Sequence, residues 1–278
     1  MKCLITLVCV LTQLFLSAAV ADEMPAKASP ARYFKTLEGM PTPSNIPTPG
    51  TLKGFIQTSE GEPMAGADIL FFNDAFGPPP MPQKYWRYFD QIAKLDDKGG
   101  FSVQLVPGKY YIGAVQRKIA NSILAPPADG DIFYYENKKY EVFSGLPDNL
   151  GVITGARPYS KNIPANGDAV TAIEGKVLDA AGNPVENAIV ASYNDATVNG
   201  MPLFGSDLTG KDGAYFLRVA GAGRYYLRVR EVYGVGAMEG ELMLAYGGSK
   251  PKGVTVKEGE VVKGIDLTGE KFLRPVNQ

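Results

Sequence analysis

Histidine is absent from this chain of 278 residues, and cysteine occurs only twice. Without histidine the chain lacks the commonest general base and the commonest zinc ligand of proteins, and it cannot bind haem through histidine. Its 28 lysine and arginine residues nearly balance 29 aspartate and glutamate residues, so the basic surface of a nucleic-acid-binding protein is missing too. We therefore expect no cofactor, no metal site and no nucleic-acid partner.

The first 21 residues have the order of a secretory signal peptide. Lys2 precedes an almost wholly apolar run from Leu4 to Leu16, and small residues end at Ala21 before Asp22. The run is shorter than the ~20 residues of a membrane-spanning helix. We expect cleavage after Ala21, export to the periplasm or the exterior, and no transmembrane segment in the mature chain. A retained N-terminal anchor is the alternative.

Both cysteines, Cys3 and Cys9, lie inside this leader. The mature chain would then have no disulfide, no thiol nucleophile and no thiolate metal site, and no cysteine stands where a lipid could be attached. An exported protein without disulfides fits a bacterial periplasm or exterior. Residues 22–50, which contain six prolines, are expected to form an extended, flexible spacer.

The rest of the chain contains an internal repeat, which indicates a duplicated folding unit. One set of residues recurs later without a gap: Gly54, Gly61, Pro63, Ala67, Asn73, Asp74 and Ala75 correspond to Gly175, Gly182, Pro184, Ala188, Asn194, Asp195 and Ala196. Conservative pairs such as Ile56 with Val177 keep the same register.

Within each copy, short alternating segments are separated by glycine-rich turns. Residues 51–57, 67–72, 101–105 and 110–114 are predicted strands of the first copy, and residues 215–219 and 225–227 match the last two in the second. No segment has the pattern of a long helix. We therefore predict an all-β chain with two tandem immunoglobulin-like or transthyretin-like antiparallel sandwiches, at residues 51–170 and 171–274.

The junction between the copies carries a further match. Gly167, Val170 and Ile173 correspond to Gly259, Val262 and Ile265. The segment 169–175 thus resembles the closing strand of the second copy and also opens that copy. This overlap predicts one continuous strand through both sandwiches, and hence a stiff pair.

The order of these signals resembles the carboxypeptidase regulatory-like, transthyretin-like domain family of the carbohydrate-binding-like fold. The residues that carry the resemblance are Ile173–Val177, Gly182–Val185, Ala188, Lys211–Tyr215 and Gly223–Leu227, with Gly61–Pro63, Gly99–Phe101 and Pro107–Tyr110 in the first copy. The resemblance implies two tandem copies of a sandwich that is mostly non-catalytic, serving as an accessory, a spacer, or a sugar- or protein-binding unit.

Enzymes with similar sandwiches rely on histidine, which this chain lacks. A hydrolase is therefore the third and least favoured class, since carboxylates alone can still catalyse acid–base chemistry. Some pilin-type relatives form an internal isopeptide bond, for which Lys176 and Asp266 are the one plausible pair; an ordinary exposed lysine is the favoured interpretation. The Asn-Asp pairs at 73–74 and 194–195 suggest either calcium ligands or turns, and turns are favoured.

The two copies differ most in an aromatic insertion of the first copy. Its segment 85–89 reads Tyr-Trp-Arg-Tyr-Phe and contains the only tryptophan of the chain, and a second loop contains Phe-Tyr-Tyr at 133–135. Aromatic rings on loops stack on sugars or anchor protein contacts; a structural cap on the sandwich is the alternative. The candidate ligand-binding residues are Tyr85, Trp86, Tyr88, Tyr134 and Tyr135.

A second candidate surface lies in the second copy. Arg218, Tyr226 and Arg228 have the outward parity of neighbouring strands and could bind an acidic glycan or protein. The sequence as a whole predicts an exported, non-enzymatic binding or scaffold protein of the bacterial envelope or exterior, whose sandwich-end loops contact another protein. The alternative is a carbohydrate-binding module with a platform around Trp86.

Overall fold

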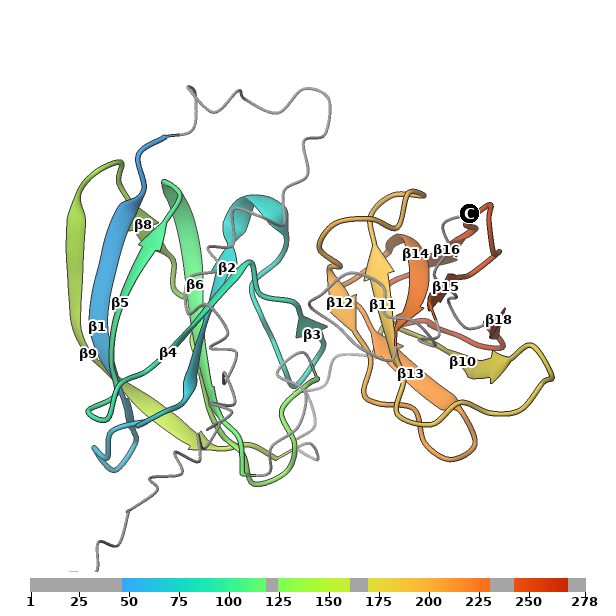
Figure 1. The fold of residues 1–278 in the computed structure, drawn as a ribbon, viewed down its shortest axis with the longest axis horizontal. Coiled ribbons are helices and arrows are strands. Elements are labelled where there is room, and N and C mark those ends of the chain that lie inside the picture. The colour runs from blue at the N-terminus through green and yellow to red at the C-terminus, as the bar shows by residue number, and fades with distance from the viewer. Residues whose placement is uncertain (1–46, 119–124, 161–169, 231–242, 270–278) are drawn as a thin grey trace, which may run out of the picture. The chain divides into compact units, whose positions relative to one another are not determined.

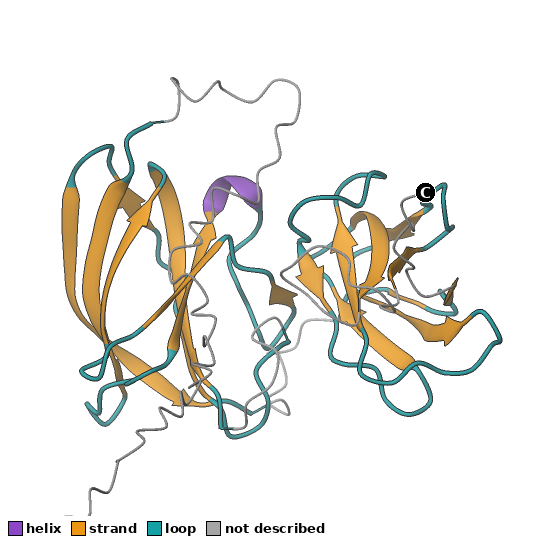
Figure 2. Cartoon of the chain, viewed as in Figure 1, coloured by secondary structure: helices purple, strands orange, loops and turns teal. Residues whose placement is uncertain are grey.

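Almost all regular structure in this protein is β-strand, as predicted (Figures 1 and 2). The computed structural model describes residues 47–118, 125–160, 170–230 and 243–269, and residues 38–278 form one compact unit. Within these ranges the only helical element is the short 3-10 turn η3 (Asp74–Phe76). The predicted signal peptide and nearly all of the spacer lie outside the described residues.

The first repeat, from Gly50 to Pro158, is a sheet of eight strands folded over a core. The strand order is β4-β2-β6-β7-β9-β1-β5, with β8 beside β6. Strand β9 pairs with β1 along most of its length and with β7 at its end, so it connects the two layers. The bounds are β1 (Gly50–Thr58), β2 (Asp68–Asn73), β4 (Gln91–Lys94), β5 (Gly100–Leu105), β6 (Gly108–Gln116), β7 (Ile132–Tyr135), β8 (Tyr140–Val142) and β9 (Pro147–Pro158).

Strand β2 is buried at every position because both of its faces are covered. Ile69 and Phe71 face the core between the layers, together with residues such as Leu52. Leu70 and Phe72 face the other way and pack in a second cluster with aromatic residues of the insertion 74–90. The insertion therefore acts as a third layer, which explains why residues 69–72 of β2 are all apolar instead of alternating.

The second repeat, from Ala172 to Gly269, consists of two sheets. One has the order β13-β10-β17, with β18 also beside β10, and the other has the order β15-β14-β11-β12-β3, with β16 beside β14. Ile173, Val190 and Leu227 belong to the core of this repeat. The bounds are β10 (Ala172–Asp179), β11 (Ile189–Tyr193), β12 (Phe204–Gly205), β13 (Ala214–Arg218), β14 (Gly223–Arg230), β15 (Met243–Ala245), β16 (Gly253–Val256), β17 (Val261–Val262), β18 (Leu267–Gly269), and β3 (Trp86–Arg87) from the insertion.

The strand pairing of the two repeats confirms the duplication. Strand β1 pairs with β5 as β10 pairs with β13, and β2 lies between β4 and β6 as β11 lies between β12 and β14. Gly54 lies opposite Phe101, and its equivalent Gly175 lies opposite Tyr215. Residues that are equivalent in the repeat alignment therefore occupy equivalent positions in the paired strands of both copies.

The closing strand of each repeat corrects two sequence-based predictions. In the first copy it is β9, not the segment 169–175, and β9 runs parallel to β1. Likewise, β17 and β18 run parallel to β10, so the sheets are mixed and not wholly antiparallel. Strand β10 starts at Ala172 and its described partners all belong to the second repeat, which contradicts a strand shared by both sandwiches. The domain boundary at residue 170 remains a prediction.

Candidate functional site

The aromatic residues of the insertion do not form an exposed platform. Tyr85, Trp86 and Tyr88 are all buried, and Trp86 is only 1% exposed. A sugar-binding platform needs accessible ring faces, so the structure corrects the expectation that these three residues form one. The alternative interpretation was a structural cap on the sandwich, and the packing of these residues agrees with it.

Each of these rings packs into a different apolar cluster. Tyr85 lies in the core of the second repeat, with its ring 5.1 Å from that of Phe204, and its hydroxyl donates to the Pro79 carbonyl at 2.7 Å. Trp86 packs edge-on against Phe133, at 6.3 Å between ring centroids. Tyr85 directly precedes strand β3, and Trp86 is the first residue of that strand. Because successive residues of an extended chain point to opposite faces, these two neighbours can pack in two different cores.

The other two tyrosines of the proposed aromatic site are also structural. Tyr134 is buried in the first core, and burial raises the pKa of its phenol, with the Glu136 carboxylate as a further cause. Tyr135 is half-buried against the outer cluster, and burial raises its pKa to about 12. Their hydroxyls therefore stay protonated at neutral pH, so neither residue supplies a base.

The second candidate surface is only partly accessible. Arg218 donates to the carbonyl of Gln83, in the insertion, at 3.0 Å, and Arg228 donates to the carbonyl of Val198 at 2.8 Å. Tyr226 is half-buried, with the guanidinium of Arg224 5.5 Å above its ring. The two candidate arginines hold backbone carbonyls in place, so they are less available to an acidic partner than the sequence suggested.

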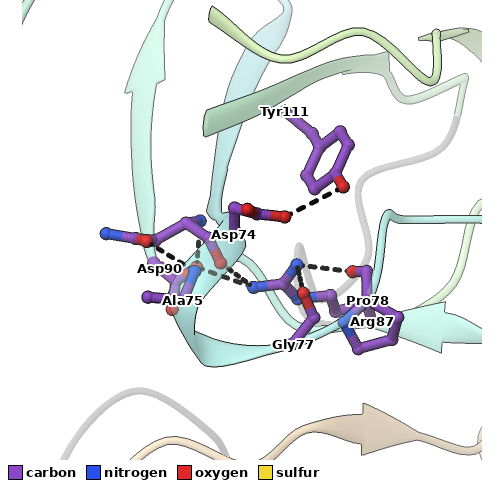
Figure 3. A network of polar contacts seen from close by, with 8 residues as sticks. Asp74, Ala75, Gly77, Pro78, Arg87, Asp90 and Tyr111 are labelled. Atoms are coloured by element: carbon purple, nitrogen blue, oxygen red, sulfur yellow. Dashed lines mark hydrogen bonds and ion pairs between the residues drawn. The ribbon is translucent and has the colours of Figure 1, made fainter. Parts of the chain in front are cut away.

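The sequence missed a buried polar network that holds the insertion (Figure 3). Arg87 is 1% exposed, and its guanidinium donates to the carbonyls of Gly77 and Asn73 and to the Asp90 carboxylate at 2.9, 2.6 and 3.2 Å. Burial lowers the pKa of Arg87 and raises that of Asp90, while the attraction between the two charges opposes both shifts. Since these donors are already engaged, the network stabilises the loop and offers no reactive group.

The first of the two Asn-Asp pairs singled out in the sequence, Asn73 and Asp74, has hydrogen-bond partners within the protein. Asp74 contacts the Tyr111 hydroxyl at 3.0 Å and the Lys139 ammonium at 2.9 Å, and the hydrogen bond to Lys139 is the main cause of its lowered pKa. Asn73 accepts from the amide of Ala75, as a turn residue does. In the part of the chain that the structure describes, no group of three or more acidic, histidine or cysteine side chains could hold a metal ion.

The possible isopeptide partners lie on neighbouring strands, but their contact is a different one. The Asp266 carboxylate accepts from the backbone N–H of Lys176 at 2.8 Å, and Lys176 is exposed, as the favoured interpretation held. The strand register shows that Phe55 and Val152 occupy these two positions in the first copy. The match of Ile173 with Ile265 in the sequence analysis places Glu174 at the position of Asp266, because it takes segment 169–175 for the closing strand of the first copy.

Three exposed apolar side chains lie close together at one end of the first repeat. The turn between β8 and β9 presents Phe143, 53% exposed, and Leu146, 60% exposed, and the turn between β5 and β6 presents Val106, 49% exposed. Both turns lie beside the start of β1, since Gly50 pairs with Leu105 and the amide of Thr51 donates to the Leu146 carbonyl at 3.0 Å (Figure 1). We call Val106, Phe143 and Leu146 the apolar end.

The second repeat has the same turn with charged side chains in place of the apolar ones. Residues 143–146 read Phe-Ser-Gly-Leu, and the equivalent residues 257–260 read Lys-Glu-Gly-Glu. The backbones match, since the amide of Leu146 donates to the Phe143 carbonyl as that of Glu260 donates to the Lys257 carbonyl. The shared glycine has φ 68° in one turn and 70° in the other. The fold therefore accepts charge here, and the apolar residues of the first copy are not required for folding.

A shallow depression of about 550 Å³ lies on the outer face of β1 and β5. Its lining includes the exposed ring of Phe55 and the polar side chains of Lys53, Ser102 and Asn149. No sequence signal marked this place. A comparison of the copies at Phe55 and Lys176 could have marked it, because an apolar residue there replaces a charged one.

Comparisons with known proteins give no family. No family model and no curated protein matches the chain. Among solved structures, the chain is similar to the Bacillus anthracis TIE protein, at 20% identity over 80% of this chain and 34% of that one, with a TM-score of 0.26. It is also similar to a streptococcal ancillary pilin (13% identity, 82% and 63% covered, TM-score 0.25) and to BcpA, the major pilin subunit of Bacillus cereus (10% identity, 81% and 100% covered, TM-score 0.25).

The chain thus spans about a third of the TIE protein and less than two thirds of the ancillary pilin. Similarity at these TM-scores carries no argument about function, and the assignment of a β-sandwich fold rests on the strand pairing and the cores described above. No helix in the described ranges is long and apolar enough to cross a membrane.

Proposed function

We propose that this protein is an exported, non-catalytic binding and scaffold protein that contacts a protein partner through the apolar end. The observation that carries the proposal is the exposure of Val106, Phe143 and Leu146 on adjacent turns. At the positions of Phe143 and Leu146 the second repeat has Lys257 and Glu260. Exposed apolar side chains gathered in one patch mark interaction surfaces. The buried titratable groups described above all have structural roles, which supports a function in binding.

The comparison of the two repeats suggests an experiment. The double variant F143K/L146E gives the turn at residues 143–146 the charged residues found in the equivalent turn at residues 257–260. The second repeat shows that a turn of this backbone conformation accepts these residues. We expect unchanged folding and the loss of partners that co-purify with the tagged wild-type protein from its own cells after mild cross-linking. The matched control is F216S, which removes an exposed aromatic residue from β13. Recovery of the same partners with F143K/L146E would contradict the proposal.

Export is the second part of the proposal, and it is tested separately. The order of charge, apolar run and small residues before Asp22 supports cleavage after Ala21. N-terminal sequencing of the protein from periplasmic and culture-medium fractions should begin at Asp22. A protein that retains Met1 and sediments with membranes would indicate an anchor instead.

Glycan binding is the second candidate function, and we propose it for the depression around Phe55, because Trp86 is buried. Phe55, 42% exposed, lies in the depression with Lys53 and Asn149, where a ring face and hydrogen-bonding groups are available together. Calorimetric titration with a glycan panel should detect binding to the wild-type protein and none to F55A. Equal titrations for both proteins would exclude this site.

A further inference from the structure

Strand β5 is the outermost strand of its sheet, and its outer edge is open. Among the strands in the described ranges, it pairs with β1 alone. Ile56 of β1 donates to the Gly99 carbonyl, while the backbone groups of Gly100 bond to Asp96 on the other side of β5. Since backbone groups alternate in direction along an antiparallel strand, those of Ser102 and Gln104 also point away from β1.

Strand β4 lies near this outer edge, but beyond Gly100 it contributes one hydrogen bond to it. The Gln104 carbonyl accepts from the side chain of Gln91 at 3.0 Å. Among the residues that the structure describes, the N–H and C=O of Ser102 and the N–H of Gln104 have no hydrogen-bond partner. A carbonyl oxygen accepts two hydrogen bonds, so the Gln104 carbonyl also has capacity for another donor.

The edge also lacks the features that normally prevent strand pairing, such as charged residues, proline or a bulge. Residues 100–105 contain no charged residue and no proline, and their register with β1 is uninterrupted. The equivalent edge strand β13 differs, because Arg218 stands where β5 has Gln104, and its guanidinium bonds to Gln83 of the insertion. The two edge strands therefore differ: β13 carries a charged residue at this position, and β5 carries the uncharged Gln104.

We propose that β5 pairs with β5 of a second copy of this chain. A two-fold axis through Val103 places Ser102 of each strand opposite Gln104 of the other, antiparallel. In this register the Ser102 N–H of one copy donates to the Gln104 carbonyl of the other copy. The Gln104 N–H of the other copy donates to the Ser102 carbonyl of the first. Every outward group named above is then bonded, and because the strand is uncharged, no like charges face each other.

The inference does not depend on the partner bound at the apolar end, and it is tested on the full exported chain. Sedimentation velocity should show a dimer that grows with protein concentration. Hydrogen exchange should slow at the amides of Ser102 and Gln104 as concentration rises, and should stay constant at those of Phe216 and Arg218 on β13.

Two variants test the edge itself. Gln104→Lys places a charge on it, and Ser102→Pro removes one donor in a way that an edge strand tolerates. Both should abolish the dimer, while the matched control F216K on β13 should retain it. Circular dichroism verifies the fold, and if the S102P variant fails to fold, Q104K decides alone. A monomer at every concentration, or a dimer that survives Q104K, would overturn the proposal. Slower hydrogen exchange at the Ser102 amide only after an extended peptide is added would assign the edge to a different partner, and would also overturn the proposal.

Discussion

At the scale of single residues, most of the unusual chemistry of this protein serves packing. Arg87 is a fully buried cation whose hydrogen bonds fix the insertion, and Tyr85 and Trp86 fill two apolar clusters. An isolated buried charge is strongly unfavourable, so Arg87 and Asp90 depend on each other. Substitutions here should therefore affect stability and leave binding at the apolar end unchanged.

The substitution R87M should lower the free energy of unfolding by about 3–5 kcal/mol, because it leaves the Asp90 carboxylate partly buried without its cation. Urea denaturation measures this loss. Without Arg87 the pKa of Asp90, already raised by burial, should rise further. A carboxyl group with a raised pKa favours the folded state more as pH falls, so the loss should be smaller in mildly acidic buffer. The double variant R87M/D90N should recover part of the stability; no recovery would show that the two charges are uncoupled.

Acid should weaken two turns through exposed carboxylates. Backbone N–H groups of Gly100 and Lys98 lower the pKa of Asp96, and hydrogen bonds from Asn183 lower that of Asp179. A lowered pKa means that stability is present above the ordinary value of 3.8 and is lost as pH falls through the lowered value. Thermal melting should show wild type losing more stability on acidification than D96N/D179N, since asparagine keeps an acceptor but does not titrate. Parallel curves would contradict this.

At the scale of elements, glycine turns fix the register in both copies. Gly99 and Gly213 have φ of 74° and 70°. A Cβ at either position would lie 2.5 Å from a carbonyl oxygen of the first strand of its repeat, β1 or β10. Gly61 and Gly182 also have positive φ, but open space surrounds them. The first pair is therefore restricted by backbone conformation and by contact, and the second by conformation alone.

Alanine at these glycines separates the two effects. G61A and G182A should each cost about 1–2 kcal/mol, the usual penalty of a left-handed conformation for a residue with a Cβ. G99A and G213A should cost more than that, because the carbonyl of the opening strand must also move. Urea denaturation compares the four variants. Equal losses at all four positions would show that the close contact is relieved without cost.

The strands that the sequence predicted are those whose physical signal is local. Alternation identified β5 and β13, and the glycine turns placed their neighbours. The sequence did not predict strand β9, because β9 lacks the alternating pattern of a half-buried strand. It contains Gly151 and Gly155 at positive φ, begins and ends with proline, and exposes most of its residues. Its pairing with β1 connects segments distant in the sequence, which no local pattern can show. Missing it led directly to the wrong closing strand.

The candidate site was harder to predict than the fold. Aromatic composition pointed to Tyr85, Trp86 and Tyr88, but composition cannot tell a binding surface from a third layer over a sheet. The contrast between residues 143–146 and 257–260 was visible in the sequence. Recognising this contrast, however, required an alignment of the two turns, and only the observed strand register provided that alignment.

At the scale of the whole molecule, the insertion makes the stability of one repeat depend on the other. Its strand β3 pairs with β12, and Tyr85 packs in the core of the second repeat. The two repeats should therefore unfold in a single transition, seen at the same temperature by Trp86 fluorescence and by circular dichroism. The variant Y85A should separate the two signals, and two separate transitions in wild type would contradict this coupling.

The parallel pairing of β1 with β9 has a mechanical consequence. The first and last strands of the repeat lie side by side over residues 51–58, so tension applied to the two ends of that repeat would load their hydrogen bonds together, in shear. Bonds that share a load resist more than bonds that open one at a time. We expect stretching of single molecules by atomic force microscopy to show a high rupture force for this repeat, and a lower one when Phe55 is replaced by proline. A sandwich closed in this way is suited to bearing traction, whichever molecule it is attached to.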